Sequence, residues 1–139
     1  MLVSYKRIGL DTNVLIYYIE EHPILLEKIE PFIERISQGK AIGITSYITL
    51  LELIVKPLRD GRPDVVDQYK AILTRQLEMV PMDEAVSIKA AHMRAKYGIR
   101  TPDAIQLASV IHRKGDVFIT NDKELKHIKD IKILILEEI

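Results

Sequence analysis

Short apolar runs alternate with longer segments of helical periodicity along this chain, and this alternation restricts the fold more than any other feature. Between the runs, apolar residues recur at helical spacing, as in Ile29, Phe32 and Ile36. Strands that are separated by helices pair in parallel, and right-handed crossovers then place helices on both faces of the sheet. The chain is therefore predicted to be an α/β protein, a three-layer α/β/α sandwich. The runs expected to form strands are residues 7–10, 41–45, 79–82, 117–120 and 132–136.

Capping residues and prolines predict where the helices begin and end. Ser46 and Asp83 are expected N-caps, and Thr101 before Pro102 is typical of an N-cap followed by proline at the first helical position. Pro57 is expected in a turn between two helices. The first helix is expected to start near residue 14, and the others are expected over residues 24–38, 47–55, 65–77, 83–97 and 102–114.

One domain, residues 1–139, accounts for the whole chain. A chain of about 150 residues hides roughly two-thirds of its unfolded surface, so one core is enough. Apolar residues make up 47% of the chain and charged residues 29%, which excludes the disordered class. Because the chain has no cysteine, any metal ion would have to be held by oxygen or imidazole ligands. Basic and acidic residues are balanced at 20 each, which gives no global signal for nucleic acid.

No segment is expected to enter a membrane or to direct secretion. The longest apolar stretches, such as residues 14–19 and 131–136, are far shorter than the roughly 20 residues of a membrane helix. The first residues lack the apolar core and the small-residue cleavage site of a secretory signal. We therefore expect a soluble protein in the cytoplasm.

Four acidic residues, Asp11, Glu52, Asp103 and Asp122, stand where a strand or loop meets a helix. In open α/β sheets, ligands bind beyond the carboxyl ends of the strands, where the strand order reverses. Two carboxylates about 4 Å apart repel by about 4 kcal/mol at an effective dielectric constant near 20. A cluster of four therefore requires a positive charge at its centre, and Mg²⁺ or Mn²⁺ suits oxygen ligands of this kind.

Each acid also has a purely local explanation. Aspartate is preferred at helix N-termini for its hydrogen bonding and its charge. Asp83 also follows a strand and opens a helix, but its strand is expected at the sheet edge, so we interpret it as a cap. Capping does not explain Glu52, which lies between Leu51 and Leu53. Its alternative is the solvated flank of an amphipathic helix.

The acids lie in four motifs, Leu10-Asp11-Thr12-Asn13, Leu51-Glu52-Leu53, Thr101-Pro102-Asp103-Ala104-Ile105-Gln106-Leu107-Ala108 and Thr120-Asn121-Asp122. In this order, over nearly the whole chain, they resemble the PIN-domain family of metal-dependent nucleases, and most of all its short VapC-type toxins. The resemblance implies a central parallel five-stranded sheet in the order 3-2-1-4-5. The first and fourth strands would then be neighbours.

The resemblance also implies roles for single residues. Asp11, Glu52, Asp103 and Asp122 match the family's acidic quartet, which binds Mg²⁺ or Mn²⁺ and is catalytic. Polar residues beside the quartet match positions that orient the acids or a bound water, although helix capping or turn formation would also explain them. These residues are Asn13 and Thr120.

The implied activity is that of a metal-dependent endoribonuclease that hydrolyses RNA phosphodiester bonds. The VapC likeness further implies the toxin of a type II toxin–antitoxin pair, a homodimer, and an antitoxin protein that occupies the active-site groove. Several basic residues are candidates to hold RNA phosphates, and the alternative for each is a solvated surface charge. They are Arg100, Lys56 and Arg59, together with Arg94 and Lys96.

Other functions share parts of this pattern. A haloacid-dehalogenase-type phosphatase also begins with an acid after its first strand, but it requires Asp-x-Asp where this chain has Asp11, Thr12 and Asn13. A phospho-receiver domain requires a lysine after its last strand, where this chain continues with Glu137 and Glu138. A catalytically silent PIN-like module that binds RNA or protein would keep the acids without turnover.

Overall fold

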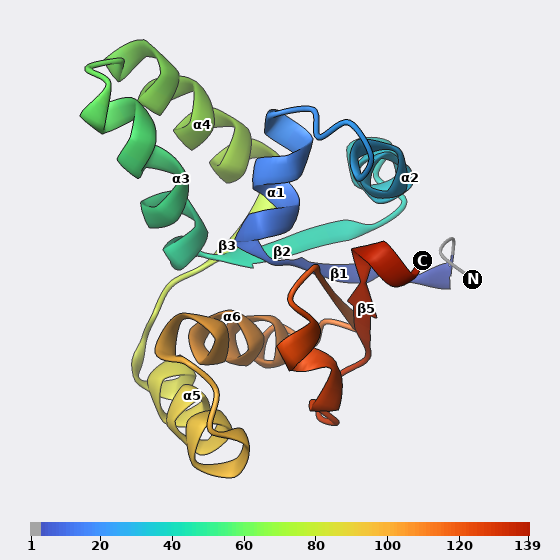
Figure 1. The fold of residues 1–139 in the computed structure, drawn as a ribbon. Coiled ribbons are helices and arrows are strands. Elements are labelled where there is room, and N and C mark those ends of the chain that lie inside the picture. The colour runs from blue at the N-terminus through green and yellow to red at the C-terminus, as the bar shows by residue number, and fades with distance from the viewer. Residues whose placement is uncertain (1–3) are drawn as a thin grey trace.

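The computed structural model describes residues 4–139, and within them five parallel strands form one sheet in the order β3-β2-β1-β4-β5 (Figure 1). This order confirms the predicted fold class and strand order. The chain adds β2 and β3 on one side of β1, and then β4 and β5 on the other. The strands are β1 (Arg7–Leu10), β2 (Ile42–Ser46), β3 (Leu77–Val80), β4 (Val117–Thr120) and β5 (Ile133–Ile135).

Helices cover both faces of the sheet, with α1 to α4 on one side and α5 and α6 on the other (Figure 1). Side chains that alternate along the strands build a separate core on each face. Ile119 packs with Ile8 and Leu10 on the first face, whereas Phe118 packs with α5 and α6 on the second. The helices are α1 (Thr12–Ile19), α2 (Leu26–Ser37), α3 (Tyr47–Arg59), α4 (Pro63–Gln76), α5 (Glu84–Tyr97) and α6 (Thr101–His112), with short 3₁₀ turns η2 (Lys123–His127) and η3 (Leu136–Glu138).

The carboxyl ends of β1 and β4 lie side by side. Leu10 pairs with Ile119, and the backbone N–H of Asp11 donates to the carbonyl of Ile119 at 3.0 Å. On the second face, Gly9 lets α6 approach β1 closely, because a Cβ at this position would lie 2.5 Å from a methyl group of Val110. The switch point of the sheet is therefore between β1 and β4, with α6 packed directly beside it.

Two element boundaries differ from the prediction for reasons that involve proline. β3 covers Leu77–Val80 rather than residues 79–82, because Pro81 has no N–H to donate to a ladder. It is an edge strand, as expected. Pro57 lies inside α3 and not in a turn, since its buried ring shares one helix face with Thr49 and Leu53. The turn follows at Gly61, whose φ of 65° is left-handed.

The ends of α2 and α6 also differ from the prediction. The N-cap of α6 is Arg100, in an extended conformation, so Thr101 is the first helical residue and not the cap. The same helix ends at His112, because Lys114 takes the left-handed turn with a φ of 59°. Before α2, the imidazole of His22 accepts hydrogen bonds from the backbone N–H groups at residues 24 and 25. This cap holds those two residues in a turn, and the helix starts at 26.

None of the helices among residues 4–139 is both long and apolar enough to span a membrane.

Candidate metal centre

Asp11 lies at the end of β1 and caps α1. One carboxylate oxygen accepts the backbone N–H of Thr12 at 2.8 Å, and the other accepts the hydroxyl of Thr120 at 2.7 Å. Only 7% of the residue is exposed. Both oxygens are therefore held in place, one by the helix that Asp11 starts and the other by the neighbouring strand β4.

Asp103 and Asp122 approach the same place from other elements. Asp103 is in the first turn of α6, is 9% exposed, and pairs with Arg100 at 3.2 Å. Asp122 follows β4 and caps η2 by accepting the backbone N–H of Glu124 at 3.0 Å. Its own backbone N–H donates to the hydroxyl of Thr120 at 3.0 Å, so Thr120 contacts both Asp11 and Asp122.

Glu52 projects from the second turn of α3. The residue is exposed overall, whereas its neighbour Leu53 is buried in the core. The carboxylate accepts the hydroxyl hydrogen of Thr12 at 2.7 Å. Glu52 therefore lies at the boundary of the apolar face and is directed by the residue next to Asp11.

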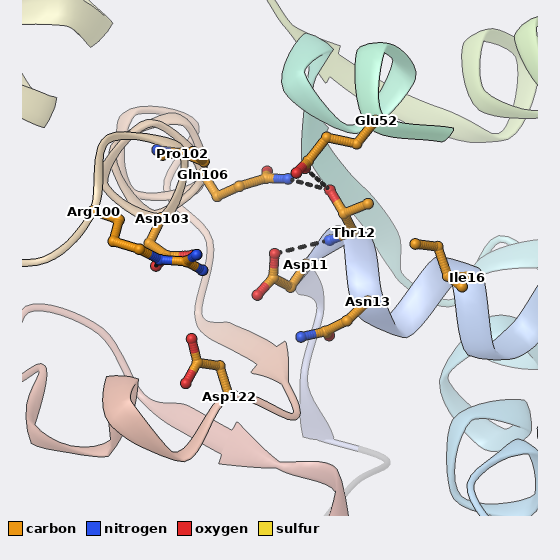
Figure 2. Close-up of a pocket in the computed structure, with 10 residues that line it drawn as sticks. All are labelled: Asp11, Thr12, Asn13, Ile16, Glu52, Arg100, Pro102, Asp103, Gln106 and Asp122. Carbon is orange, nitrogen blue, oxygen red and sulfur yellow. Dashed lines mark hydrogen bonds and ion pairs between the residues drawn. The ribbon is translucent and has the colours of Figure 1, made fainter. Parts of the chain in front are cut away.

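All four acids line one cleft of about 230 Å³ at the switch point. Figure 2 shows their carboxylates pointing into the same space from four separate elements. Arg100 and Gln106 also line this cleft. Four segments that are distant in sequence thus place negative charge in one hollow.

Burial and mutual repulsion disfavour negative charge in the cleft. The pKa of Asp11 is raised from 3.8 to about 6, mainly by burial and less by the charges of Asp103 and Glu52, while hydrogen bonds from Thr120 and Thr12 act in the opposite direction. The pKa of Asp103 is also raised, first by burial and then by the charges of Asp122 and Glu52, although Arg100 opposes this. Without a cation, the ionised cluster therefore carries a cost.

The chemistry of the donors suits a hard divalent cation, because all four are carboxylates. As the side chains stand, however, no three acidic or histidine groups within residues 4–139 are arranged to hold an ion together. Arg100 forms an ion pair with Asp103, and the Thr12 hydroxyl donates a hydrogen bond to one oxygen of Glu52. Coordination of one ion by three of these groups would therefore require side-chain rotation, above all the release of Asp103 by Arg100.

Asn13 and Thr120 connect the acids. The Asn13 amide nitrogen donates to the Thr120 hydroxyl oxygen at 3.4 Å, and its oxygen accepts the backbone N–H of Asn121 at 3.3 Å. Thr120 in turn donates to Asp11. These contacts tie the segment of Asp122 to the end of β1, beyond simple turn formation.

The basic candidates are placed unequally. Arg100 lines the cleft, and Lys56 lines a neighbouring hollow together with Glu52. Arg59 is exposed at the end of α3 and does not line the cleft. Arg94 donates to the carbonyl of Ile99 at 2.9 Å, and Lys96 pairs with Asp130 at 3.3 Å. Arg94 and Lys96 thus have structural contacts of their own.

Gln106 did not stand out as a site residue in the sequence, yet it lines the cleft and is 1% exposed. A polar residue within a run of apolar side chains, between Ile105 and Leu107, was the available signal.

The model of a family described as the PIN domain matches residues 8–131. Three solved structures resemble the chain in fold. A "toxin-antitoxin complex" from Klebsiella pneumoniae has a TM-score of 0.73 at 18% identity, covering 94% of this chain and 98% of that one. VapBC2 from Rickettsia felis, bound to a promoter DNA fragment, has a TM-score of 0.74 at 18% identity, covering 93% of this chain and 98% of that one. DNA-bound VapBC from Salmonella typhimurium has a TM-score of 0.71 at 25% identity, covering 95% of this chain and 98% of that one. No curated protein matches the sequence.

Proposed function

The chain belongs to the PIN-domain family, and on that premise we propose that it is a metal-dependent endoribonuclease that hydrolyses RNA phosphodiester bonds. The observation that carries this proposal is the cleft lined by Asp11, Glu52, Asp103 and Asp122. Ionised carboxylates gathered from four elements repel one another, which costs free energy, and they become ligands when a cation is present.

The proposed roles follow from how each acid is held. Asp11 is held at both oxygens by Thr12 and Thr120, so it is the most rigid ligand. Asp103 and Asp122 close the site from α6 and the end of β4. A bound Mg²⁺ or Mn²⁺ would supply the positive charge that makes a water more acidic and offsets charge on the reacting phosphate. The buried side of the cleft lowers the local dielectric and strengthens these interactions.

Arg100 and Lys56 are proposed to hold phosphates of the RNA. The side chain of Arg100 is 74% exposed at the edge of the cleft, and its pKa is raised, chiefly by the charge of Asp103. Once a cation occupies the acids, the guanidinium would be free to pair with a phosphate in a bidentate manner. Arg59, further along α3, would contact a more distant part of the strand.

We also propose that the protein is the toxin of a type II toxin–antitoxin pair and acts as a homodimer in the cytoplasm. The likeness to solved toxin–antitoxin complexes supports an antitoxin protein as a partner. For the dimer, support comes from an apolar stripe on the exposed face of α3. Its members are Tyr47, Leu51, Val55 and Leu58, which are 44%, 59%, 43% and 59% exposed.

The competing proposal is a silent module that binds RNA or protein without cleaving it. What favours it is the Arg100–Asp103 ion pair, because a guanidinium of the chain itself offsets the charge of one acid. The two proposals differ in turnover and in the need for a metal.

The decisive experiment measures cleavage of a broad RNA panel with Mg²⁺, with Mn²⁺ and with EDTA. Wild-type protein should cleave with either cation and stop with EDTA, and Asp122→Asn and Glu52→Gln should lose activity while staying folded by circular dichroism. RNA binding without cleavage under every condition would establish the silent module instead. Cleavage that survives EDTA would contradict a metal-dependent mechanism.

A further inference from the structure

Gln106 lies one turn after Asp103 on α6 and is almost completely buried. Its amide nitrogen donates to the hydroxyl oxygens of Thr12 and Thr49, at 3.0 and 2.6 Å. Its amide oxygen accepts the backbone N–H of Ser46 at 3.2 Å. One side chain thus satisfies all of its donors and contacts α1, α3 and the end of β2.

The hydrogens of this network leave little freedom. The backbone N–H at residue 46 can only donate, so the amide oxygen must face it and both amide hydrogens point to Thr12 and Thr49. Thr45 gives its hydrogen to the carbonyl of Leu10 at 2.9 Å, which leaves Thr49 to donate to Thr45 at 2.7 Å. Thr12 also lies 3.0 Å from the Thr49 hydroxyl, but the Glu52 carboxylate can only accept, so Thr12 gives its hydrogen to Glu52 at 2.7 Å.

We propose that Gln106 is a positioning residue that, through Thr12, fixes the carboxylate of Glu52 in the cleft. Figure 2 shows this chain of contacts from Gln106 to Thr12 and on to Glu52. The proposal rests on the proposed function, because it assigns Glu52 to the metal site. It goes further by making the orientation of Glu52 depend on a residue of the helix that carries Asp103.

The burial of Gln106 supports a specific role. Glutamine is rarely buried this fully, and an amide that loses its partners in an apolar interior costs free energy. The residues around it on α6 are buried and apolar: Ala104, Ile105, Leu107 and Ala108. An aliphatic residue would suit that helix, but it would leave Thr12 and Thr49 without their donor. Thr12 could then turn its hydrogen away from Glu52.

The test is the affinity for Mn²⁺ alone, measured by calorimetry in the absence of RNA. We compare wild type with Gln106→Met, which keeps the length of the side chain and removes its hydrogen bonds. Loss of a residue that orients a metal ligand typically weakens metal binding by about 10-fold to 100-fold, and the same range is expected here. In a Glu52→Gln background, Gln106→Met should cause little further weakening, because the two residues act as one unit.

Three other variants separate positioning from folding. Ser109→Ala is the matched control, since Ser109 is buried on the same helix and its hydroxyl donates only to the Ile105 carbonyl at 2.6 Å; its Mn²⁺ affinity should equal that of wild type. Thr12→Val removes the hydrogen bond to Glu52 and leaves the contact between Gln106 and Ser46 in place. It should weaken Mn²⁺ binding as well, so it tests the proposal even if Gln106→Met does not fold. Thr12→Ser keeps the hydroxyl and should restore binding.

Equal affinity of Gln106→Met and wild type would overturn the proposal. So would a Gln106→Met effect of the same size in the Glu52→Gln background, because that result describes a general loss of structure. A wild-type protein that does not bind Mn²⁺ would overturn the proposed function and this inference together. Wild-type binding with an unaffected Gln106→Met variant would overturn this inference alone.

Discussion

The N-termini of α1 and α5 look alike locally but differ in their surroundings. Asp11 and Asp83 each follow a strand, each adopt an extended backbone, and each accept a backbone N–H of the helix they start. Asp83 accepts from Val86 at 2.9 Å and is exposed to solvent. Asp11 is 7% exposed and accepts a second hydrogen bond from Thr120 of the neighbouring strand.

The position of the preceding strand explains this difference. β1 is the central strand and has β4 beside it, so other acids reach the end of β1. β3 is at the edge of the sheet, and the described residues place Asp83 outside the acidic cleft. A capping aspartate thus becomes a candidate ligand only when the sheet topology brings further carboxylates to it.

The largest expected effect that separates the two aspartates is on RNA cleavage. Asp11→Asn removes the best-held of the four proposed ligands, and the loss of several kcal/mol of transition-state stabilisation corresponds to about 10³-fold or more in kcat. Asp83→Asn keeps a capping side chain outside the cleft, and its cleavage rate should match wild type. The measurement is single-turnover cleavage with Mn²⁺. If both variants lost the same cleavage activity, the loss would reflect a lower stability of the protein and not the removal of a catalytic group.

A second expected effect concerns the pH dependence of stability without metal. In the folded protein the pKa of Asp11 is about 6, above its ordinary value of 3.8, so the folded state holds this proton more tightly than the unfolded state. The contribution of Asp11 to the free energy of unfolding is therefore fully present below pH 4 and is lost as the pH rises through 6. The difference in pKa corresponds to at most about 3 kcal/mol. Asp11→Asn should not show this loss.

Urea unfolding in EDTA at a series of pH values measures this loss. Thr12 and Thr120 donate to different oxygens of Asp11, and asparagine replaces one of these oxygens with an NH₂ group, which lowers the stability of Asp11→Asn independently of this titration. The informative quantity is therefore the difference in the free energy of unfolding between wild type and variant, and how much this difference changes between pH 4 and pH 7. Asp83→Asn is the matched control, because it replaces a capping aspartate at an exposed site. The same change in both variants would contradict the role assigned to burial.

A third expected effect is stabilisation by the cation itself. A ligand at ten times its Kd stabilises the folded state by about 1.4 kcal/mol. Mn²⁺ should therefore raise the melting temperature of wild type and of Asp83→Asn, and should raise it little in Asp11→Asn. Differential scanning fluorimetry with Mn²⁺, with Ca²⁺ and with EDTA measures this. Equal stabilisation of all three proteins would place the bound ion outside the cleft.

The fold was predictable because its signals are local. Apolar runs and caps are short-range features, and the fold class and the edge position of β3 that they predicted were confirmed. The strand order, which the family resemblance implied, was confirmed as well. The errors arose where apolar periodicity and caps do not decide the outcome. Pro57 is held inside α3 by burial in the core, which is a tertiary effect. The imidazole of His22 delays the start of α2 through a local cap that the spacing of apolar residues does not report.

The site was predictable in part for the same reason. The four acids carry motifs, and the structure places all of them on one cleft, although their roles as ligands remain a prediction. The role of Gln106 could not be predicted, because it depends on contacts with Thr12 and Thr49, 94 and 57 positions away. The pairing of Arg100 with Asp103 depends on the rotamers of two side chains, which no sequence pattern reports.

The smallest expected effect tests the other half of the comparison, that Asp83 is a cap and nothing more. Asp83→Ala removes the side chain that accepts the Val86 N–H, and loss of an N-cap costs about 1 kcal/mol. The free energy of unfolding should fall by that amount, whereas the Mn²⁺ affinity should stay at the wild-type value. Asp83→Ser, which keeps a capping oxygen without charge, should recover most of the loss. A change in Mn²⁺ affinity in either variant would mean that α5 contributes to the cleft, and the contrast between central and edge strands would no longer explain which aspartate binds metal.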